Sequence, residues 1–339
     1  MEINFLSAYL LSILIFYLLY KNEKLITKKF RLIDYPDKFR KAHKKQTSLI
    51  GGLLIFSCLT YLIIIDQLLN INNIFTLKII FILIPIFIVG LLDDIRDLSP
   101  TNKTILLSFL IFFFLYLNNE FLLRELYFDD FRKTYLLNNF FSYFVTLLCI
   151  LLLINAFNMS DGINGLAHSI TIIWLIILMI LFDLNITFYF ITLIIFLSFL
   201  LNYKGKYFLG NSGSLLLSSF IGFLTIYLYN FNLNSKNLVS VEKITLLFLI
   251  PGLDMLRLFI LRISNNKSPF SGDVNHFHHY LVKNFYLHKA IILYLFLILW
   301  PFIFIQFYKV KYFFIFLIQA IIFFFLVSYF KNKKNLRIS

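Results

Sequence analysis

Apolar segments long enough to cross a lipid bilayer recur along this whole chain. A helix needs about 20 apolar residues to span the hydrocarbon core, and runs of about 17–20 follow one another here. Hydrophobic residues make up 60% of the 339 and charged residues 14%, which is more apolar than a soluble domain of this size. The sequence therefore predicts an all-α polytopic membrane protein, with a single transmembrane domain over residues 1–339.

We expect ten or eleven transmembrane helices from these segments. The predicted spans are approximately 3–20, 49–65, 75–92, 104–117, 140–154, 167–183, 186–201, 213–230, 242–261, 288–306 and 312–330. The first segment lacks a preceding basic region and a small-residue cleavage site, so we expect a retained helix and not a removed signal peptide.

Lysines and arginines determine the expected orientation, because cytoplasmic loops carry an excess of them. Loop 21–48 carries ten and the tail after residue 330 carries four. We therefore expect the N terminus outside and the C terminus in the cytoplasm. Five internal loops then face the cytoplasm and are expected to form a catalytic cleft: 21–48, 93–103, 155–166, 202–212 and 262–287.

The formal net charge of +14 fits positive loops lying against anionic lipid. Nucleic acid is not an expected partner, because no basic helix or soluble module carries this charge.

Two adjacent aspartates, Asp93 and Asp94, end the third predicted span and are followed by Asp97. Adjacent carboxylates repel, which raises the proton affinity of one of them unless a cation relieves the pair. On a helix Asp93 and Asp97 would share a face, which suits a hard cation or a carboxylate acting as a base. The alternative is a solvated acidic helix end. A second pair, Asp129-Asp130, falls on an expected external loop, and we assign it to the surface.

Polar residues are concentrated in the run from Asn155 to Ala167, between two apolar segments. Asn155, Asn158 and Asp161 recur every three residues, so they would lie near one another on a helix, and Asn164 continues the series. Glycines within the run allow close approach of a ligand to the backbone. A set of helix caps would explain one such residue but not four.

The run from Leu209 to Ser214 opens the eighth predicted span. Glycines before a helix N terminus expose backbone N–H groups that can bind phosphate. A helix cap formed by Ser212 or Ser214 is an equally good interpretation.

Three histidines, His276, His278 and His279, lie in the last large cytoplasmic loop. Zinc is one interpretation, but no cysteine is nearby and candidate carboxylates are few. Contact with phosphate fits the neighbouring cations better, Arg257 among them. In the first basic loop, Lys45 is a further candidate for substrate binding, although that loop can also be a pure orientation signal.

These clusters all lie at one membrane face and combine carboxylates, a glycine loop, cations and histidines. That combination is typical of sites that neutralise a diphosphate while a phosphoryl group transfers.

With these motifs the chain resembles the polyprenyl-phosphate N-acetylhexosamine-1-phosphate transferases, a glycosyltransferase 4 family. It includes the undecaprenyl-phosphate GlcNAc-1-phosphate transferases and the phospho-N-acetylmuramoyl-pentapeptide transferase. The resemblance covers about residues 30–285, with the motifs in the same order. Its most specific parts are the Asn-Ala-x-Asn-x-x-Asp-Gly-x-x-Gly-Leu run from Asn155 and the His-x-His-His run from His276.

The resemblance implies transfer of a sugar 1-phosphate from a UDP-sugar to undecaprenyl phosphate, with release of UMP and a requirement for Mg²⁺. It implies a bacterial plasma (inner) membrane protein with a cytoplasmic active site, acting early in cell-envelope glycan synthesis such as that of O-antigen. A homodimer is left open.

The resemblance also implies individual roles. Asp93 and Asp94 would serve the lipid phosphate and the metal, one of them as a base. Asn158 and Asp161 would contact the nucleotide sugar, and the three histidines would bind the diphosphate. Asp97 matches the Asp-Asp-x-x-Asp form of the GlcNAc branch, whereas the pentapeptide branch resembles Asp-Asp-x-x-Lys. We therefore expect GlcNAc-1-phosphate or another HexNAc-1-phosphate to be transferred.

The expected site residues all lie on or beside the five cytoplasmic loops. The candidate catalytic residues are Asp93, Asp94, Asp161 and His279. The candidate substrate-binding residues are Lys45, Asp97, Asn155, Asn158, Asn164, Arg257, His276 and His278. The candidate ligands for Mg²⁺, or for Mn²⁺ in its place, are Asp93, Asp94, Asn158 and Asn211.

Two positions depart from the family pattern. Asn164 and Asn211 stand where the family usually has aspartate, and the aspartate at the second position is regarded as a metal ligand. An amide oxygen can coordinate Mg²⁺ but brings no charge. A weakly active or non-catalytic relative that binds lipid phosphate and nucleotide sugar is therefore one alternative, and the pentapeptide transferase is another. A transporter is less favoured, because transporters place ionisable residues near the bilayer midplane.

Overall fold

The computed structural model describes residues 2–35, 46–69, 77–233, 238–269, 275–308 and 310–332. Helices dominate these residues, with only two short antiparallel β-hairpin pairings. In chain order the elements are α1 (Glu2–Lys21), α2 (Glu23–Phe30), β1 (Ile33–Asp34), β2 (Thr47–Ser48), α3 (Gly51–Leu68), α4 (Lys78–Arg96), α5 (Pro100–Leu117), η1 (Asn119–Phe121), β3 (Glu125–Phe128), β4 (Lys133–Leu136), α6 (Asn139–Ser160), α7 (Leu166–Phe182), α8 (Ile186–Tyr203), α9 (Gly210–Asn232), α10 (Val241–Ser264), α11 (Phe277–Asn284), α12 (Leu287–Phe307) and α13 (Tyr312–Asn332).

Each of the eleven predicted spans corresponds to one long helix, namely α1, α3 to α10, α12 and α13. Eight of these helices are long and apolar enough to cross a membrane. The apolar part of α1 and helix α7 are slightly shorter, and α4 carries charged residues near both of its ends. The prediction of an all-α polytopic membrane protein is confirmed. The two short helices α2 and α11 and the β3–β4 hairpin were not predicted.

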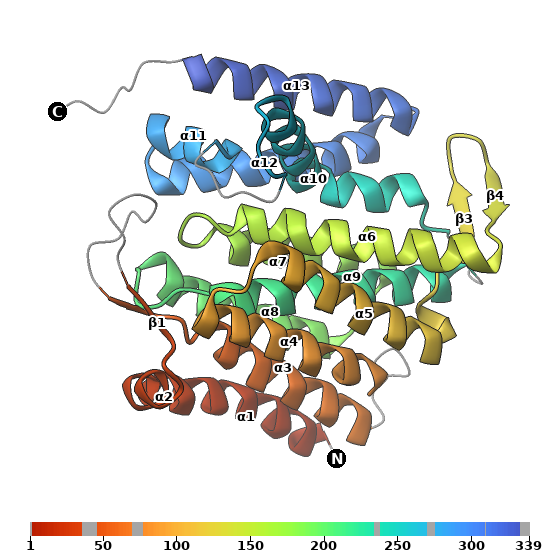
Figure 1. Ribbon diagram of the computed structural model, residues 1–339. Coiled ribbons are helices and arrows are strands. Elements are labelled where there is room, and N and C mark those ends of the chain that lie inside the picture. Colours follow the sequence, from red (N-terminus) through yellow and green to blue (C-terminus); the bar gives the residue numbers. More distant parts are fainter. Residues whose placement is uncertain are drawn as a thin grey trace.

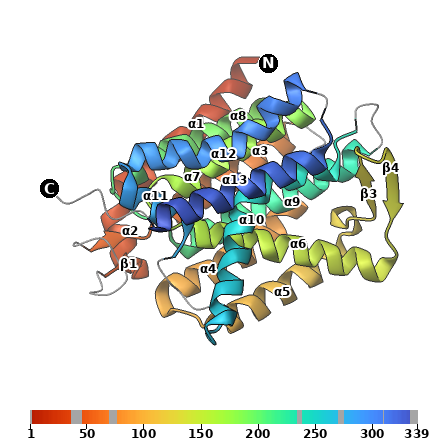
Figure 2. The same cartoon turned by 90° about the horizontal axis from the view of Figure 1, so that it is seen from above.

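Most of the long helices run roughly parallel or antiparallel to one another (Figure 1), whereas α10 points across them (Figure 2). Helix α1 begins near the same end of the bundle as the β3–β4 hairpin, whereas α2, β1 and α11 lie at the other end, where α13 finishes (Figures 1 and 2). The loops expected in the cytoplasm therefore share an end with α2 and α11. Which end faces the cytoplasm stays a prediction.

Helix α9 is the centre of the bundle and is buried over most of its length. It packs against α3, α4, α6 and α7. Its first turns are rich in glycine and serine, and small residues let neighbouring helices approach closely. The N terminus of α9 is thereby held among α3, α4 and α6, at the end of the bundle that also carries α11.

Backbone hydrogen bonds join the segment after the first basic loop to the segment before α9. Phe208 N donates to Ser48 O at 2.8 Å, and Gly52 N donates to Leu209 O at 2.9 Å. These bonds fix the start of α3 beside the start of α9, although some 160 residues separate them in sequence.

The interpretation of Asp129-Asp130 as a surface pair is wrong. The Asp130 carboxylate accepts hydrogen bonds from the backbone N–H groups of Tyr312 at 2.7 Å and Phe313 at 2.9 Å, so it caps the N terminus of α13. Glu242 on α10 accepts the backbone N–H groups of Asp129 and Asp130, each at 3.2 Å. The turn of the β3–β4 hairpin therefore ties α10 to α13 at this end of the bundle.

Candidate active site

Asp94 and the N terminus of α9 form the first part of the site. The Asp94 carboxylate accepts the backbone N–H of Asn211 at 2.7 Å and that of Ser212 at 3.0 Å. Gly210 has φ of 76°, and a Cβ atom there would lie 2.7 Å from Asp94 Oδ2, so the turn needs glycine for two reasons. Asp94 therefore caps α9 from another helix.

This arrangement changes the prediction for the run from Leu209 to Ser214. The expected phosphate cradle is wrong for the Asn211 and Ser212 amides, because Asp94 already accepts both. The alternative of a serine cap is also wrong, since the N-cap position is Leu209 and no side chain caps from it. A carboxylate is favoured at this position by the helix dipole and by the unpaired N–H groups of the first turn.

Asp93 has a different environment from Asp94. Its carboxylate accepts the Lys103 ammonium group at 2.9 Å and the backbone N–H of Leu98 at 2.9 Å. Successive residues on a helix point about 100° apart, so Asp93 faces α5 while Asp94 faces α9. The expectation that Asp93 and Asp97 share a helix face is wrong, because α4 ends at Arg96 and Asp97 is an exposed C-cap with a left-handed φ of 48°.

The end of α6 supplies the second part of the site. Ser214 Oγ, in the first turn of α9, donates to Asn158 Oδ1 at 2.6 Å. Helix α6 ends at Ser160, and Asp161 is its C-cap. Asn155 instead donates to the carbonyl of Leu151 in its own helix at 2.8 Å. The structure thus brings Asn158, but not the Asn155 amide, into contact with the start of α9.

The charge of Asp94 acts on the carboxyl group of Asp161. Burial, with a smaller contribution from the Asp94 charge, raises the pKa of Asp161 to about 7. Burial also raises the pKa of Asp94 to about 6, against the lowering effect of its bonds to Ser212 and Asn211 and with a smaller raising contribution from Asp93. Both groups lie just beyond the predicted spans. A cation between them would relieve this repulsion.

The loop after Asp161 is held by helix α8. Gly165 N donates to Asn202 Oδ1 at 2.6 Å, and Asn202 Nδ2 donates to Tyr207 O at 2.9 Å. Asn202 is buried and so joins the loop 161–165 to the segment that leads into α9. Asn164 lies beside the turn after α8, where a Cβ on Gly205 would be 3.5 Å from its Nδ2.

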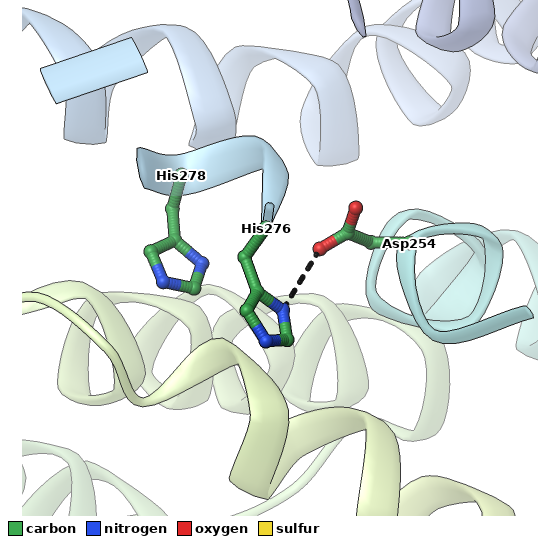
Figure 3. Close-up of side chains that lie close together, drawn as sticks. All are labelled: Asp254, His276 and His278. Carbon is green, nitrogen blue, oxygen red and sulfur yellow. Dashed lines mark ion pairs between the residues drawn. The ribbon is translucent and has the colours of Figure 1, made fainter. Parts of the chain in front are cut away.

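The histidines form the third part of the site. His276 and His278 project side by side from the start of α11, and Asp254 on α10 faces His276 (Figure 3). Their rings are stacked with centroids 5.2 Å apart, and the ring of His279 lies 4.3 Å from that of His278. Burial lowers the pKa of His278 well below its ordinary value, and the other two histidines lower it further, so His278 is neutral at physiological pH.

Asp254 organises this region. His276 Nδ1 lies 3.4 Å from Asp254 Oδ2, and Arg257 Nη2 donates to Asp254 Oδ1 at 2.7 Å. The backbone N–H of Phe277 also donates to the Asp254 carboxylate, at 3.2 Å, so Asp254 caps α11 from α10. Arg257, expected to contact phosphate, is buried and donates in addition to Asn275 O at 2.6 Å.

Gly162 joins the histidines to the end of α6. The His278 ring lies directly over it, and a Cβ atom at this position would overlap His278 Nε2. Glycine is therefore required here by close approach of a side chain and not by an unusual backbone angle. Through this contact α11 packs onto the loop that carries Asp161.

Three residues of this region were not predicted from the sequence. Asp254 carried a signal, because it stands with Arg257 inside a predicted membrane span. Ser214 was considered only as a helix cap, and Lys103 gave no signal. Lys45 lies outside the described residues.

An apolar cavity of about 370 Å³ lies between α6, α9 and α10. It extends from Leu123 beside the hairpin to Ala156 on α6 and Met255 on α10. Ala156 and Met255 are close in sequence to Asn158 and Asp254. The apolar cavity thus reaches the end of the bundle where the candidate site lies.

A family description and several relatives match this chain. The description "Glycosyl transferase family 4" matches residues 76–229, which run from α4 to α9. A protein of Thermotoga maritima named undecaprenyl-phosphate alpha-N-acetylglucosaminyl 1-phosphate transferase is 30% identical over 252 residues, 74% of this chain and 73% of the relative. A protein of the same name from Escherichia coli strain K12 is 28% identical over 304 residues, 84% of this chain and 78% of the relative.

Both alignments cover most of this chain and most of the relative. The region that matches the family description contains Asp94, Asp161 and Asn211. Together with the eight described helices that are long and apolar enough to cross a membrane, they establish that this integral membrane protein belongs to glycosyl transferase family 4.

Proposed function

We propose that this protein transfers a sugar 1-phosphate from a UDP-sugar to undecaprenyl phosphate and releases UMP. GlcNAc-1-phosphate, or another HexNAc-1-phosphate, is the proposed group. The names of the Escherichia coli and Thermotoga maritima relatives support both the lipid acceptor and the sugar. The phospho-N-acetylmuramoyl-pentapeptide transferase activity is the less favoured alternative.

The observation that carries this proposal is the meeting of polar groups from four helices at one end of an apolar bundle. Asp94 from α4, Asn158 at the end of α6 and Ser214 in α9 are linked by the hydrogen bonds at the start of α9. The ring of His278, on α11, packs against Gly162 in the loop that follows Asp161. A charged nucleotide sugar can reach such a site from water and a lipid phosphate from the bilayer, so both substrates have access.

Magnesium fits the oxygen donors around the start of α9. The donors proposed to hold it are the Asp94 carboxylate and the side-chain oxygens of Asn158 and Asn211. Mg²⁺ is usually bound by one or two carboxylates together with substrate phosphates. Asp93, which we expected in this set, is ion-paired with Lys103, so we leave it out. When bound, the ion neutralises charge on the transferring phosphoryl group.

The proposed chemistry is in-line displacement at phosphorus. An oxygen of undecaprenyl phosphate forms a bond to the β-phosphorus of the UDP-sugar, and the bond from that phosphorus to the bridging oxygen breaks, so UMP leaves with the electron pair. Asp161, with a pKa of about 7, is suited to take a proton from the acceptor phosphate at neutral pH. The remaining side chains act by positioning and by charge neutralisation.

The apolar cavity beside α6 and α10 supports a polyprenyl substrate. Its lining is almost entirely aliphatic and aromatic, so isoprene units can enter it from the bilayer without loss of an apolar environment and would be held there by van der Waals packing. The cavity ends near Asn158 and Asp254, so a chain lying in it would bring its phosphate close to the site.

A membrane assay tests the proposal. Membranes containing the protein are incubated with undecaprenyl phosphate, Mg²⁺ and radiolabelled UDP-GlcNAc, and labelled lipid is extracted. We expect labelled lipid from the native protein and none from Asp94→Ala or His279→Ala. Asp129→Asn, at the opposite end of the bundle, is the control and should keep full activity. Full activity in both site variants would contradict the assignment.

The same assay with Asn211→Asp tests the non-catalytic alternative. Product from the native protein shows that Asn211 is tolerated at the site. Product only from Asn211→Asp would mean that the native protein binds substrates without efficient transfer. No product from either would turn attention to other UDP-sugars.

A further inference from the structure

A cluster of three potential metal ligands is formed by Asp254, His276 and His278. One ligand atom from each residue lies within 4.8 Å of the others. All three side chains are buried, with exposed fractions of 3%, 7% and 1%. They come from α10 and from the start of α11, so only the packing of these two helices brings them together (Figure 3).

The histidine nitrogens at this cluster have no hydrogen-bond partners among the described residues. This applies to His276 Nδ1 and to both ring nitrogens of His278. Buried polar atoms are almost always paired, and leaving one unpaired is costly. Three such nitrogens in two adjacent rings therefore indicate a ligand that the described residues do not supply.

The spacing of the atoms suits a metal ion. His276 Nδ1 lies 3.4 Å from Asp254 Oδ2 without forming a hydrogen bond. Two ligand atoms bound about 2 Å from a tetrahedral zinc ion lie about 3.3 Å from each other. The observed separation matches that of two neighbouring ligands, and a nitrogen of His278 lies within 4.8 Å of the other two ligand atoms, so a small movement of its ring would complete the set.

The surroundings of Asp254 resemble those of a metal-binding carboxylate. Arg257 donates two hydrogen bonds to Asp254 Oδ1, from Nε at 3.2 Å and from Nη2 at 2.7 Å. Ligating carboxylates are themselves held by hydrogen bonds of this kind. Both Arg257 bonds go to Oδ1, so Oδ2 is the oxygen that faces His276.

We propose that Asp254, His276 and His278 bind a transition-metal ion of the zinc class. Imidazole and carboxylate together suit Zn²⁺ and Co²⁺, whereas Mg²⁺ prefers oxygen ligands alone. Three protein ligands leave a fourth position for water or a phosphate oxygen. The ion lies over the loop that carries Gly162, and it joins α10 to α11. Its ligands differ from the oxygen donors proposed for Mg²⁺ at the start of α9, and binding of the ion can be measured without the proposed transfer reaction.

Cobalt binding to the purified full-length protein tests this site directly. The protein carries an affinity tag without histidines and is freed of metal with EDTA, which is then removed. Co²⁺ is added in detergent solution and its visible absorption is recorded. We expect one Co²⁺ per chain with the absorption of a low-coordinate site, lost on addition of equimolar Zn²⁺ and unaffected by millimolar Mg²⁺.

Variants separate the proposed ligands from other histidines. His278→Ala and Asp254→Asn should lower the affinity for Co²⁺ by about 100-fold or more. His288→Ala, an exposed histidine on α12, should leave it unchanged. A second variant, His278→Gln, keeps the size of the side chain in case His278→Ala fails to fold. The proposal is overturned if the native protein binds no Co²⁺, or if folded His278 variants bind it as tightly as the native protein does.

The outcome is independent of the transfer assay. If the native protein binds Co²⁺ but transfers no sugar 1-phosphate, only the proposed function is refuted. If it transfers the sugar 1-phosphate but binds no Co²⁺, only the metal site is refuted.

Discussion

Asp94 on α4 and Asn211 on α9 are joined by a hydrogen bond of 2.7 Å from the Asn211 backbone amide to the Asp94 carboxylate. The aspartate thus has a structural role, as the cap of the central helix, in addition to the proposed role in catalysis. Any variant of Asp94 will change both properties, so the two must be measured separately.

We predict that Asp94→Ala lowers the stability of the protein by about 1 kcal/mol, the typical value of a helix cap, and lowers transfer by about 100-fold or more. Asp94→Asn keeps one acceptor oxygen but loses the charge, so it should be more stable than Asp94→Ala and equally inactive. Thermal unfolding in detergent and the membrane transfer assay provide the two measurements.

Asp97→Asn is the matched control for stability, because it removes an exposed carboxylate from the same end of α4. Asp97→Asn should unfold at the same temperature as the native protein. If Asp94→Asn kept full transfer activity, the carboxylate charge would have no part in the reaction.

The raised pKa of Asp161 predicts that stability falls as pH rises. Its pKa is about 7 in the folded protein, against an ordinary value of 3.8. The folded state therefore binds more protons than the unfolded state between about pH 4 and pH 7. This contribution to stability is fully present below pH 4 and is lost as pH rises through 7.

Asp161→Asn should reduce this pH dependence, because the amide stays neutral. The measurement is the midpoint of thermal unfolding at pH 5 to 8, in buffer with EDTA so that no divalent cation binds the carboxylate. The unfolding midpoint of Asp161→Asn should still depend on pH to some extent, since the pKa of Asp94 is also raised. Equal slopes for the native protein and Asp161→Asn would show that Asp161 ionises as an exposed carboxylate does.

Gly162→Ala should displace His278, because the new methyl group would overlap its ring. We expect Co²⁺ affinity to fall about 10-fold or more, as it does when the support of a ligand is lost. Gly252→Ala is the matched control: no atom lies within 4 Å of the Cβ it would add, and Co²⁺ binding should be unchanged. Native affinity in Gly162→Ala would mean that His278 does not need its observed position to bind the metal.

The opposite end of the bundle offers a variant that affects stability alone. Asp130→Ala removes the cap of α13 and should destabilise the protein by about 1 kcal/mol, while membrane transfer per folded molecule stays native. Asp129→Asn retains an oxygen acceptor for its 3.2 Å bond from the Tyr127 hydroxyl group and should have little effect. A large loss of transfer in folded Asp130→Ala would link this end of the molecule to the site.

The sequence predicted the long helices well, because a membrane span depends on a property that each segment has by itself. A run such as 140–154 must pair its backbone N–H and C=O groups internally in lipid, and the helix is how one segment does so. Short elements were missed for the opposite reason. The β3–β4 hairpin depends on contacts with Tyr229 and Glu242, more than 100 residues away.

The candidate site was predicted in part. Asp94, Asn158, Asp161 and His278 were found from their spacing and from their unusual polarity at the membrane boundary. Asn155 was placed with them because it follows the same period of three, yet its amide bonds to its own helix. The spacing of residues determines which face of a helix a side chain occupies. It does not determine whether that side chain forms a hydrogen bond within its own helix instead of in the site.

By itself the sequence determined the number and character of the long helices and the order of the polar motifs along the chain, since hydropathy and charge are local properties. Only the tertiary structure decided the partners of each polar group. It assigned Asp93 to Lys103 and Asp94 to α9, although the two are adjacent. It also brought Asp254 to His276, which supplied the carboxylate that the histidine motif lacked. Such pairings depend on how the helices pack, because a buried charge needs an opposite charge or a hydrogen bond, and the unpaired backbone groups at a helix end need a cap. The packing decides which residue provides them.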